Sequence, residues 1–427
     1  MPTPDDHPQR YPLVSELHAR PFPALAAPCE AAFLAIKEPA DAANRDRARD
    51  HAHLVALLSR HGASAPDAEV THHAGTIGRH ALKWESHTEF VTYSAFSPGL
   101  SDRPFDPALA EVFPADWRAE APGRRLAAVL IRVDYLPDMG ALEGRLSGWF
   151  VPESLAVAAI HDGQAVIAGD FRIDPSGQMR FAVFVRPDTG PQRVGRIVQR
   201  LCEIETYRAM SMLGLPQARA LNARLNGIDR RLLDLVADMS DEARPAEEVL
   251  HGLLTVSAEL EALAMRHAFR FGATAAYEAI VRERLDVLRE TRLEGWQTFG
   301  EFFLRRYDPA MRTVASAERR LQRMAERATR AGELLQTRVD VERQAQNQDL
   351  LASMDRRAAL QLRLQHTVEG LSVVAIGYYA VSLAAYALAP LAKGAGIGKE
   401  VLTAVLVPPV LLAVWWVIRR RIRQGGH

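Results

Sequence analysis

Apolar residues in the first 190 positions occur in short runs and in alternation, which is typical of β-strands. The run "CEAAFLAIKE" (29–38) has the length of one strand, and residues 68–96 alternate and turn as antiparallel strands do. Residues 125–136 begin a second series, in which Asp162-Gly163 and Pro175-Ser176-Gly177 mark the turns of a meander.

One helix is expected among these strands, over residues 40–62 and ending at Gly62. The pattern therefore predicts an α+β fold class, with a cytosolic mixed α/β domain over residues 1–190. We expect four or more antiparallel strands with a helix against one face.

From residue 191 the strand pattern gives way to apolar residues spaced by three and four, which predicts long helices to residue 366. Breaks are expected near Gly214-Leu215-Pro216, from Asp241 to Pro245, at Gly272 and at Asp308-Pro309. The second predicted domain is a helical, coiled-coil-like stalk over residues 191–366.

An apolar seam runs along the last part of this region. Its first part falters at Arg338 and Glu342, and a second part then resumes. The first part consists of Val314, Ala317, Leu321, Met324, Ala328, Ala331 and Leu335, and the second of Leu351, Met354, Ala358 and Leu362. Two alternatives fit the seam: an antiparallel helical hairpin within one chain, or a coiled coil between subunits.

Two segments near the C-terminus have the length and apolarity of membrane spans, residues 368–389 and 401–418. With the short loop between them they predict a two-helix transmembrane hairpin over residues 367–420. Arginines flank its outer ends, so the positive-inside rule places both chain termini in the cytoplasm. The predicted location is the bacterial inner membrane, multi-pass, with the lipid bilayer as partner.

Two groups of side chains in this hairpin have predicted roles, one as a membrane anchor and one as a polar stripe. Trp415 and Trp416 with Arg419, Arg420 and Arg421 are expected to anchor the second span at the inner interface. A polar stripe on the first span is expected either to line a pore or to pack between subunits of a homo-oligomer. The stripe consists of Ser372, Tyr379, Ser382 and Tyr386, while Gly377, Ala380, Ala384 and Ala387 form a separate small-residue face for the other span.

Composition narrows the function classes. Lys plus Arg equals Asp plus Glu at 52 each, so no net charge favours nucleic acid as a partner. The two cysteines, Cys29 and Cys202, have no metal-ligand spacing and fit a reducing compartment. The N-terminal residues hold acids and prolines without an apolar run, so we expect no secretory signal there.

The chemical candidates are few. In "KWESHTEF", Glu85, His87 and Glu89 would share one face of an unbroken strand and could hold a divalent metal, the only cofactor that the sequence suggests. The alternative is a solvated strand face with cross-strand partners. Glu16, His18 and Arg20 in "ELHARPF" could grip an anion or a partner. No nucleophile motif or phosphate-binding loop is present, so the sequence favours a non-enzymatic role.

Three strings carry a resemblance to a family: "ELHARPF" (16–22), "KWESHTEF" (83–90) and "QNQDLLASMDRRAALQLRLQHTVEGLSVVAIGYYAV" (346–381). They resemble the bacterial membrane-anchored proteins catalogued as domain of unknown function 3422. This resemblance implies a membrane protein and supplies no reaction.

The order of parts also looks like that of CorA-type magnesium channels, in which the first span lines a pore and ends in a Gly-Met-Asn signature. Here the corresponding window reads "YALAPLAKGAGIGKE" without that triplet. The sequence thus favours a membrane-anchored scaffold or sensor, homo-oligomeric. The alternatives are a divalent-cation channel or transporter and, third, a metal-dependent enzyme.

Overall fold

The computed structural model describes residues 6–7, 9–11, 13–14, 21–40, 44–239, 244–293, 295–394 and 398–424. By its internal contacts the chain divides into two units. The first comprises Met1–Arg244 and His251–Gly332, and the second Pro245–Leu250 and Glu333–His427. The predicted residues Glu16, His18 and Arg20 lie outside the described residues.

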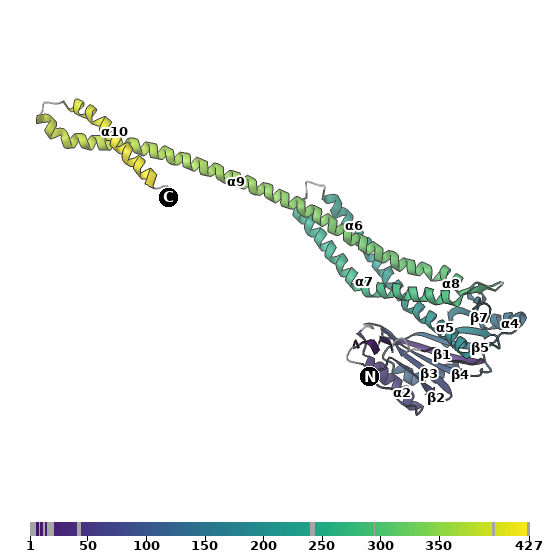
Figure 1. Cartoon of the computed structure of the whole chain (residues 1–427). Helices are drawn as coiled ribbons and strands as arrows, with labels where there is room; N and C mark the ends of the chain where they lie inside the picture. Colours follow the sequence, from purple (N-terminus) through teal and green to yellow (C-terminus); the bar gives the residue numbers. More distant parts are fainter. Residues whose placement is uncertain are drawn as a thin grey trace. The chain divides into compact units, whose positions relative to one another are not determined.

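The first unit is built on a nine-stranded sheet, so the predicted mixed α/β fold class is confirmed. Its strand order is β2-β3-β4-β1-β5-β8-β7-β6-β9, antiparallel except where β5 pairs with β8 (Figure 1). The strands are β1 (Cys29–Lys37), β2 (His72–Ile77), β3 (His80–Ser86), β4 (Phe90–Pro98), β5 (Arg124–Tyr135), β6 (Ala156–Ile160), β7 (Ala165–Ile173), β8 (Met179–Val185) and β9 (Thr291–Arg292).

Helices cover both faces of the sheet, whereas the sequence predicted a helix against one face. In β1, Phe33 belongs to one hydrophobic core and Leu34 to the other, and the whole strand is buried. A strand buried on both faces reads as a continuous apolar run rather than as an alternation. One face is covered by α2 (Arg47–Arg60), α3 (Ala115–Ala119) and α4 (Met139–Trp149), with the 3-10 helices η2 (Pro107–Val112) and η3 (Pro152–Ser154) nearby in the sequence.

The other face is covered by the helices that follow the meander. They are α5 (Pro191–Met212), α6 (Gly214–Asp238), α7 (Ala246–Leu288), α8 (Phe299–Arg306) and α9 (Asp308–Gly394), of which α6 contacts its neighbouring helices rather than the sheet core. The breaks expected near residues 214 and 308 are confirmed. Of the break expected from Asp241 to Pro245, Arg244 and Pro245 are not helical, and residues 241–243 lie outside the described residues.

The break expected at Gly272 is wrong, because α7 continues through it. One interior glycine costs a helix only about 1 kcal/mol relative to alanine, and the adjacent Phe271 and nearby Thr274 are buried. The short strand β9 was not predicted; its two residues pair with β6 at the end of the sheet.

The first part of the seam is covered within the single chain. Its seven side chains are at most 7% exposed, and Arg320 on the same helix donates to the side chain of Asn226 in α6 at 2.8 Å. This favours helix packing inside one chain for that part. In the second part Leu351, Met354 and Leu362 are 58–61% exposed.

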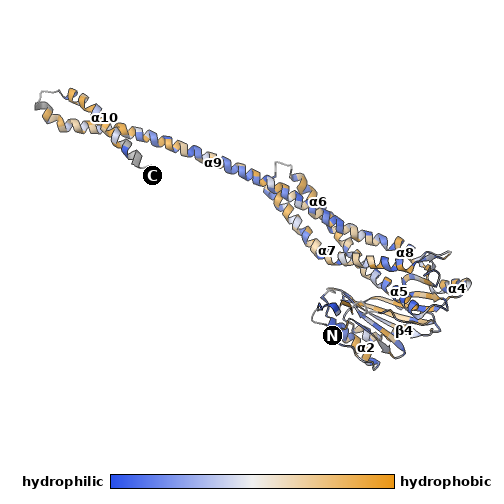
Figure 2. Ribbon diagram, viewed as in Figure 1, coloured by the Kyte–Doolittle hydropathy of each residue, from blue (hydrophilic) through white to orange (hydrophobic). Residues whose placement is uncertain are grey.

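The second unit contains the end of α9 and α10 (Lys399–Gln424), both strongly apolar (Figure 2). These two helices are long and apolar enough to cross a membrane, and very little of their apolar segments is buried in the chain. At one point they meet: a Cβ added to Gly377 would lie 3.0 Å from a methyl group of Leu411. The small-residue face of the first span therefore includes a contact with the second.

Candidate functional site

A cavity of about 260 Å³ lies between the sheet and the helices of the first unit. Its floor comes from β1, β3 and β4, and its other walls from α5 and α7. The extended segment before β1 contributes Phe22 at one side. This segment can approach α5 because residue 195 is a glycine, whose missing Cβ would overlap the carbonyl oxygen of Pro23.

The strand register arranges the floor as a grid. Ser94 of β4 lies between Lys83 of β3 and Phe33 of β1, and Thr92 of β4 lies between Glu85 and Ala35 in the same way. Directly opposed residues on neighbouring strands have Cβ atoms about 5 Å apart. The centre of the floor is therefore small and hydroxylated, with charged residues on the β3 side.

Phenylalanine rings close the ends and the far side of this grid. Phe90 and Phe96 stand on β4 beyond Thr92 and Ser94, and Phe33 stands on β1. All three are buried, at 6% exposure or less. Period-two alternation places these rings and the two hydroxyls on the same face of the sheet.

Charged side chains at the cavity are linked in one network. The Lys83 ammonium lies 3.3 Å from a Glu85 carboxylate oxygen and donates to the amide oxygen of Gln199 at 2.9 Å. The amide nitrogen of Gln199 donates to Glu203 at 2.8 Å, and Arg284 donates to the other oxygen of Glu203 at 2.5 Å. Two acids and two bases thus alternate along the wall of the cavity.

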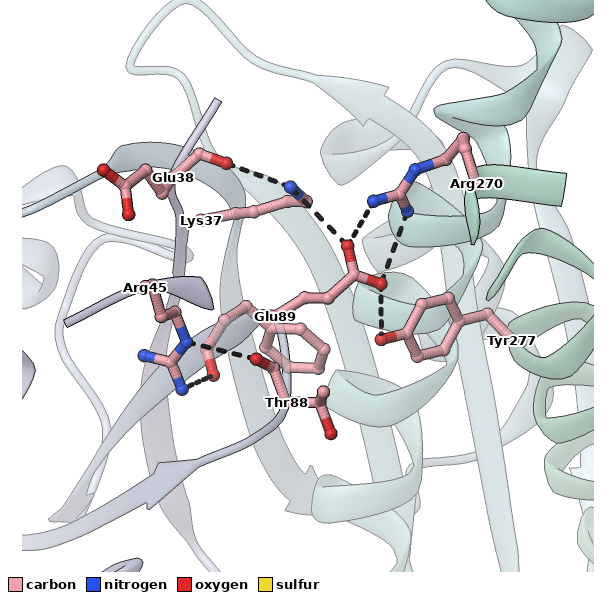
Figure 3. A network of polar contacts seen from close by, with 8 residues as sticks. Lys37, Glu38, Arg45, Thr88, Glu89, Arg270 and Tyr277 are labelled. Atoms are coloured by element: carbon pink, nitrogen blue, oxygen red, sulfur yellow. Dashed lines mark hydrogen bonds and ion pairs between the residues drawn. The ribbon is translucent and has the colours of Figure 1, made fainter. Parts of the chain in front are cut away.

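A second polar cluster fixes the turn between β3 and β4 beside the cavity (Figure 3). Glu89 is 1% exposed and forms ion pairs with Arg270 of α7 and, at 3.7 Å, with Lys37 at the end of β1. The Tyr277 hydroxyl donates to the same carboxylate at 3.1 Å. Burial lowers the pKa of Lys37, the neighbouring charge of Arg270 lowers it further, and Glu89 opposes both effects.

Arg45 holds the backbone of this turn from the opposite side. Its guanidinium donates to the carbonyl oxygen of Thr88 (Figure 3). It also donates to the Ser86 hydroxyl at 2.9 Å and to the carbonyl oxygens of His87 and Phe90, and it pairs with Asp50 in α2. Carbonyl groups that leave the ladder at a hairpin turn need such donors when they are buried. The turn is thereby fixed between α2 and α7.

The structure divides the three residues that the sequence grouped as a metal site. Strand β3 ends at Ser86, so Glu85 lies on the strand while His87 and Glu89 lie in the turn. Glu85 pairs with Lys83, His87 stacks on Phe90, and Glu89 pairs with Arg270. Across the described ranges, no group of three or more His, Cys, Asp or Glu residues could hold a metal ion. The metal site stays a prediction.

Neither cysteine is an activated nucleophile. Both are free and buried, and burial raises the pKa of the Cys29 thiol to about 12. Cys202 lines the cavity, and burial raises the pKa of its thiol as well. A nucleophilic cysteine requires the opposite shift.

Sequence reasoning missed most of the cavity. Thr92 and Ser94 alternate with apolar residues in "FVTYSAF", which marks hydroxyls inside a strand that is otherwise buried. On α5, Gln199, Glu203 and Thr206 recur at helical spacing on the helix face that covers the sheet. These two patterns were the available signals.

The predicted membrane-segment residues lie as follows. Ser372, Tyr379 and Tyr386 are exposed and Ser382 is half-buried, whereas Gly377 faces α10. Trp415 and Trp416 are exposed, and the Arg420 guanidinium lies over the Trp416 ring at 5.2 Å. The side chains of Arg419 and Arg421 lie outside the described residues.

Comparison with known proteins adds the family. A search of the curated proteins finds no match to this chain. Residues 5–425 match the model of a family described as "Protein of unknown function (DUF3422)". Because the match covers nearly the whole chain, the protein belongs to the DUF3422 family.

Proposed function

We propose that this protein is a membrane-anchored scaffold or sensor, with its α/β domain held at the bilayer by a hairpin of two spans. The observation that carries the proposal is the exposure of the apolar segments of α9 and α10, of which 11% and 0% are buried in the chain. Burying apolar surface stabilises by roughly 25 cal/mol per Å². A lipid bilayer provides that burial for helices of this length.

The charges beside the two segments support an orientation. Arg356, Arg357 and Arg363 precede the first segment, and four arginines lie in "IRRRIRQ" after the second. The connecting loop has only Lys393 and Lys399 as basic residues. On the positive-inside rule both termini lie in the cytoplasm, so the proposed location is a bacterial inner membrane.

The second part of the seam supports self-association. Leu351, Met354 and Leu362 repeat on one side of α9 and are more than half exposed, while nearby residues such as Arg356 and Arg357 are charged. Apolar side chains that repeat by three and four along a charged helix without cover in the single chain are typical of a coiled-coil contact. We propose that copies of the chain associate through this stripe as a homo-oligomer.

A divalent-cation channel is the alternative, and the polar stripe of the first span favours it to a limited extent. Ser372, Tyr379 and Tyr386 are exposed in the single chain, although the Lys399 ammonium of α10 lies 5.8 Å from the centroid of the Tyr386 ring. In an oligomer such a stripe either lines an axis or bonds between subunits. Cation flux in liposomes that is lost in Ser372→Leu would favour the channel.

Two measurements test the anchor. The full-length protein is expected to stay in the membrane pellet after alkaline carbonate washing of lysed cells, and recovery in the supernatant would contradict the proposal. For orientation, Gly398→Cys is introduced in the loop and Gln348→Cys before the first segment. A membrane-impermeant maleimide applied to spheroplasts should label the first variant and not the second.

The native thiols provide a low background for this labelling, because Cys29 and Cys202 are buried. Permeabilised cells should label both variants, which controls for expression and accessibility. Labelling of Gln348→Cys alone in sealed spheroplasts would reverse the proposed orientation.

A further inference from the structure

The hydroxyls at the floor of the cavity are placed for a ligand. Thr92 and Ser94 are 5% and 9% exposed and line the cavity. Neither hydroxyl has a hydrogen-bond partner within the part of the chain that the structure describes. Neither oxygen is among the fully buried atoms without a partner in the described residues, so both are accessible from the cavity, where a bound molecule can form hydrogen bonds with them.

The charged network makes the cavity electrically balanced. Lys83 and Arg284 supply two positive charges, and Glu85 and Glu203 supply two negative charges. A ligand with a net charge would enter a partly buried site without a net counter-charge, which is costly. A ligand that carries one positive and one negative group keeps the balance.

The grid gives such a ligand two neighbouring docking points. Lys83 beside Ser94 offers a cation and a hydroxyl donor to a carboxylate, and Glu85 beside Thr92 offers an anion and a hydroxyl acceptor to an ammonium group. The two points are one alternation apart on the same face of β3 and β4.

The remaining walls suit an apolar group. Phe33, Phe90 and Phe96 surround the hydroxyls with aromatic carbon. The volume of about 260 Å³ corresponds to roughly nine water molecules at about 30 Å³ each. It is below the range typical of drug-sized ligands, so it fits a small metabolite.

We propose that the cavity binds a small zwitterion with an apolar side group, the chemical class of the apolar α-amino acids. The carboxylate lies at Lys83 and Ser94, the ammonium at Glu85 and Thr92, and the side group among the phenylalanine rings. This inference deepens the proposed function, since it names what a sensor domain would bind, yet the site itself does not require the anchor.

The test is isothermal titration calorimetry on the full-length protein in detergent, with L-phenylalanine and L-leucine as probes. Saturable binding of at least one of them is expected. 2-Phenylethylamine, which lacks the carboxylate, and 3-phenylpropanoate, which lacks the ammonium, should each bind at least about tenfold more weakly than L-phenylalanine, because each loses a charge-assisted contact.

Two variants of the cavity floor and one control variant test whether the amino acid binds in this cavity. Thr92→Val and Ser94→Ala remove one hydroxyl each and should weaken binding of the better probe by about tenfold. Thr76→Val, at an exposed position of the neighbouring strand β2 that does not line the cavity, should leave the affinity unchanged. A folded Thr92→Val with an unchanged melting temperature keeps the comparison valid, and Ser94→Ala serves if it does not fold.

Three outcomes overturn the proposal: no binding of either amino acid at millimolar concentration, equal binding of the amine or the acid analogue, or unchanged affinity in both floor variants. The proposed anchor fails separately, by release of the protein into the supernatant after carbonate washing. Binding by a protein that is not membrane-bound would therefore leave this inference standing and contradict only the anchor.

Discussion

The two parts of the seam on α9 contain the same kind of apolar side chains, but those of the first part are buried and those of the second part are exposed. In the first part Leu321 is 3% exposed, whereas in the second part Leu362 is 59% exposed. The first is covered by other helices of the same chain, and the second has no cover within the described chain. Spacing by three and four therefore identifies an apolar stripe and does not identify what covers it.

The same contrast holds for charged side chains in the two units. In the first unit Glu89 is buried between Arg270 and Lys37, and in the second Glu247 pairs with Arg343 while both side chains stay more than 60% exposed. In the buried cluster, removing one partner leaves a desolvated charge unpaired, which strongly destabilises the fold. In the exposed pair, solvent screens the charges, so the pair contributes little to stability. Substitutions matched between the two units test this contrast.

The largest effect is expected at Glu89. Glu89→Ala leaves the buried charges of Arg270 and Lys37 without their shared partner, which should lower the free energy of unfolding by about 3–5 kcal/mol. Glu247→Ala is the control and should change it by less than about 1 kcal/mol. The measurement is denaturant unfolding of the purified protein, followed by tryptophan fluorescence. Equal effects of the two variants would contradict the contrast.

The next effect concerns the two leucines of the seam. Leu321→Ala opens a cavity in a covered contact and should destabilise the chain by about 2–5 kcal/mol. Leu362→Ala should change unfolding by less than about 0.5 kcal/mol and should instead lower the mass of the detergent-solubilised particle, measured by light scattering. An oligomer that survives Leu362→Ala together with Leu351→Ala would remove the proposed role of the exposed stripe.

Glycines test the contact between the two apolar helices. Gly377→Val adds a side chain where Leu411 already lies at 3.0 Å from the position of its Cβ, and such overpacking typically costs about 1–3 kcal/mol. Gly370→Val on the same helix meets no atom within 4 Å and is the matched control. Titration with sodium dodecyl sulfate should unfold the first variant at lower detergent fraction than the second, and coincident curves would disprove the packing.

The sequence predicted the strands and long helices because each has its own period and its own turn residues. It predicted helices on one face of the sheet where the structure has them on both, since a nine-residue apolar strand such as β1 is consistent with one helical layer or two. It grouped Glu85, His87 and Glu89 by assuming an unbroken strand, and the turn after Ser86 separates them. Arg270 and Glu89 are 181 positions apart, and no local pattern connects residues at that distance. The cavity depends on such long-range contacts, so only its alternating hydroxyls left a signal in the sequence.

The smallest effect is a pH dependence in the helical layer opposite the cavity, at His53. Its Nε2 lies 3.0 Å from the Trp117 carbonyl oxygen, so this nitrogen carries the proton, and its Nδ1 accepts from the Tyr93 hydroxyl at 2.9 Å. Burial lowers the pKa of His53. The unfolded chain therefore binds more protons than the folded one below the ordinary histidine pKa of about 6.5.

The free energy of unfolding should be independent of His53 at pH 8 and should fall below pH 6.5, by at most about 1.4 kcal/mol per pH unit. In His53→Gln this share of the slope should disappear between pH 6.5 and 5, as measured by denaturant unfolding at each pH. Parallel pH profiles of the variant and the parent would show that His53 accepts a proton without loss of its contacts, and its site would then resemble the exposed second unit more than the covered first one.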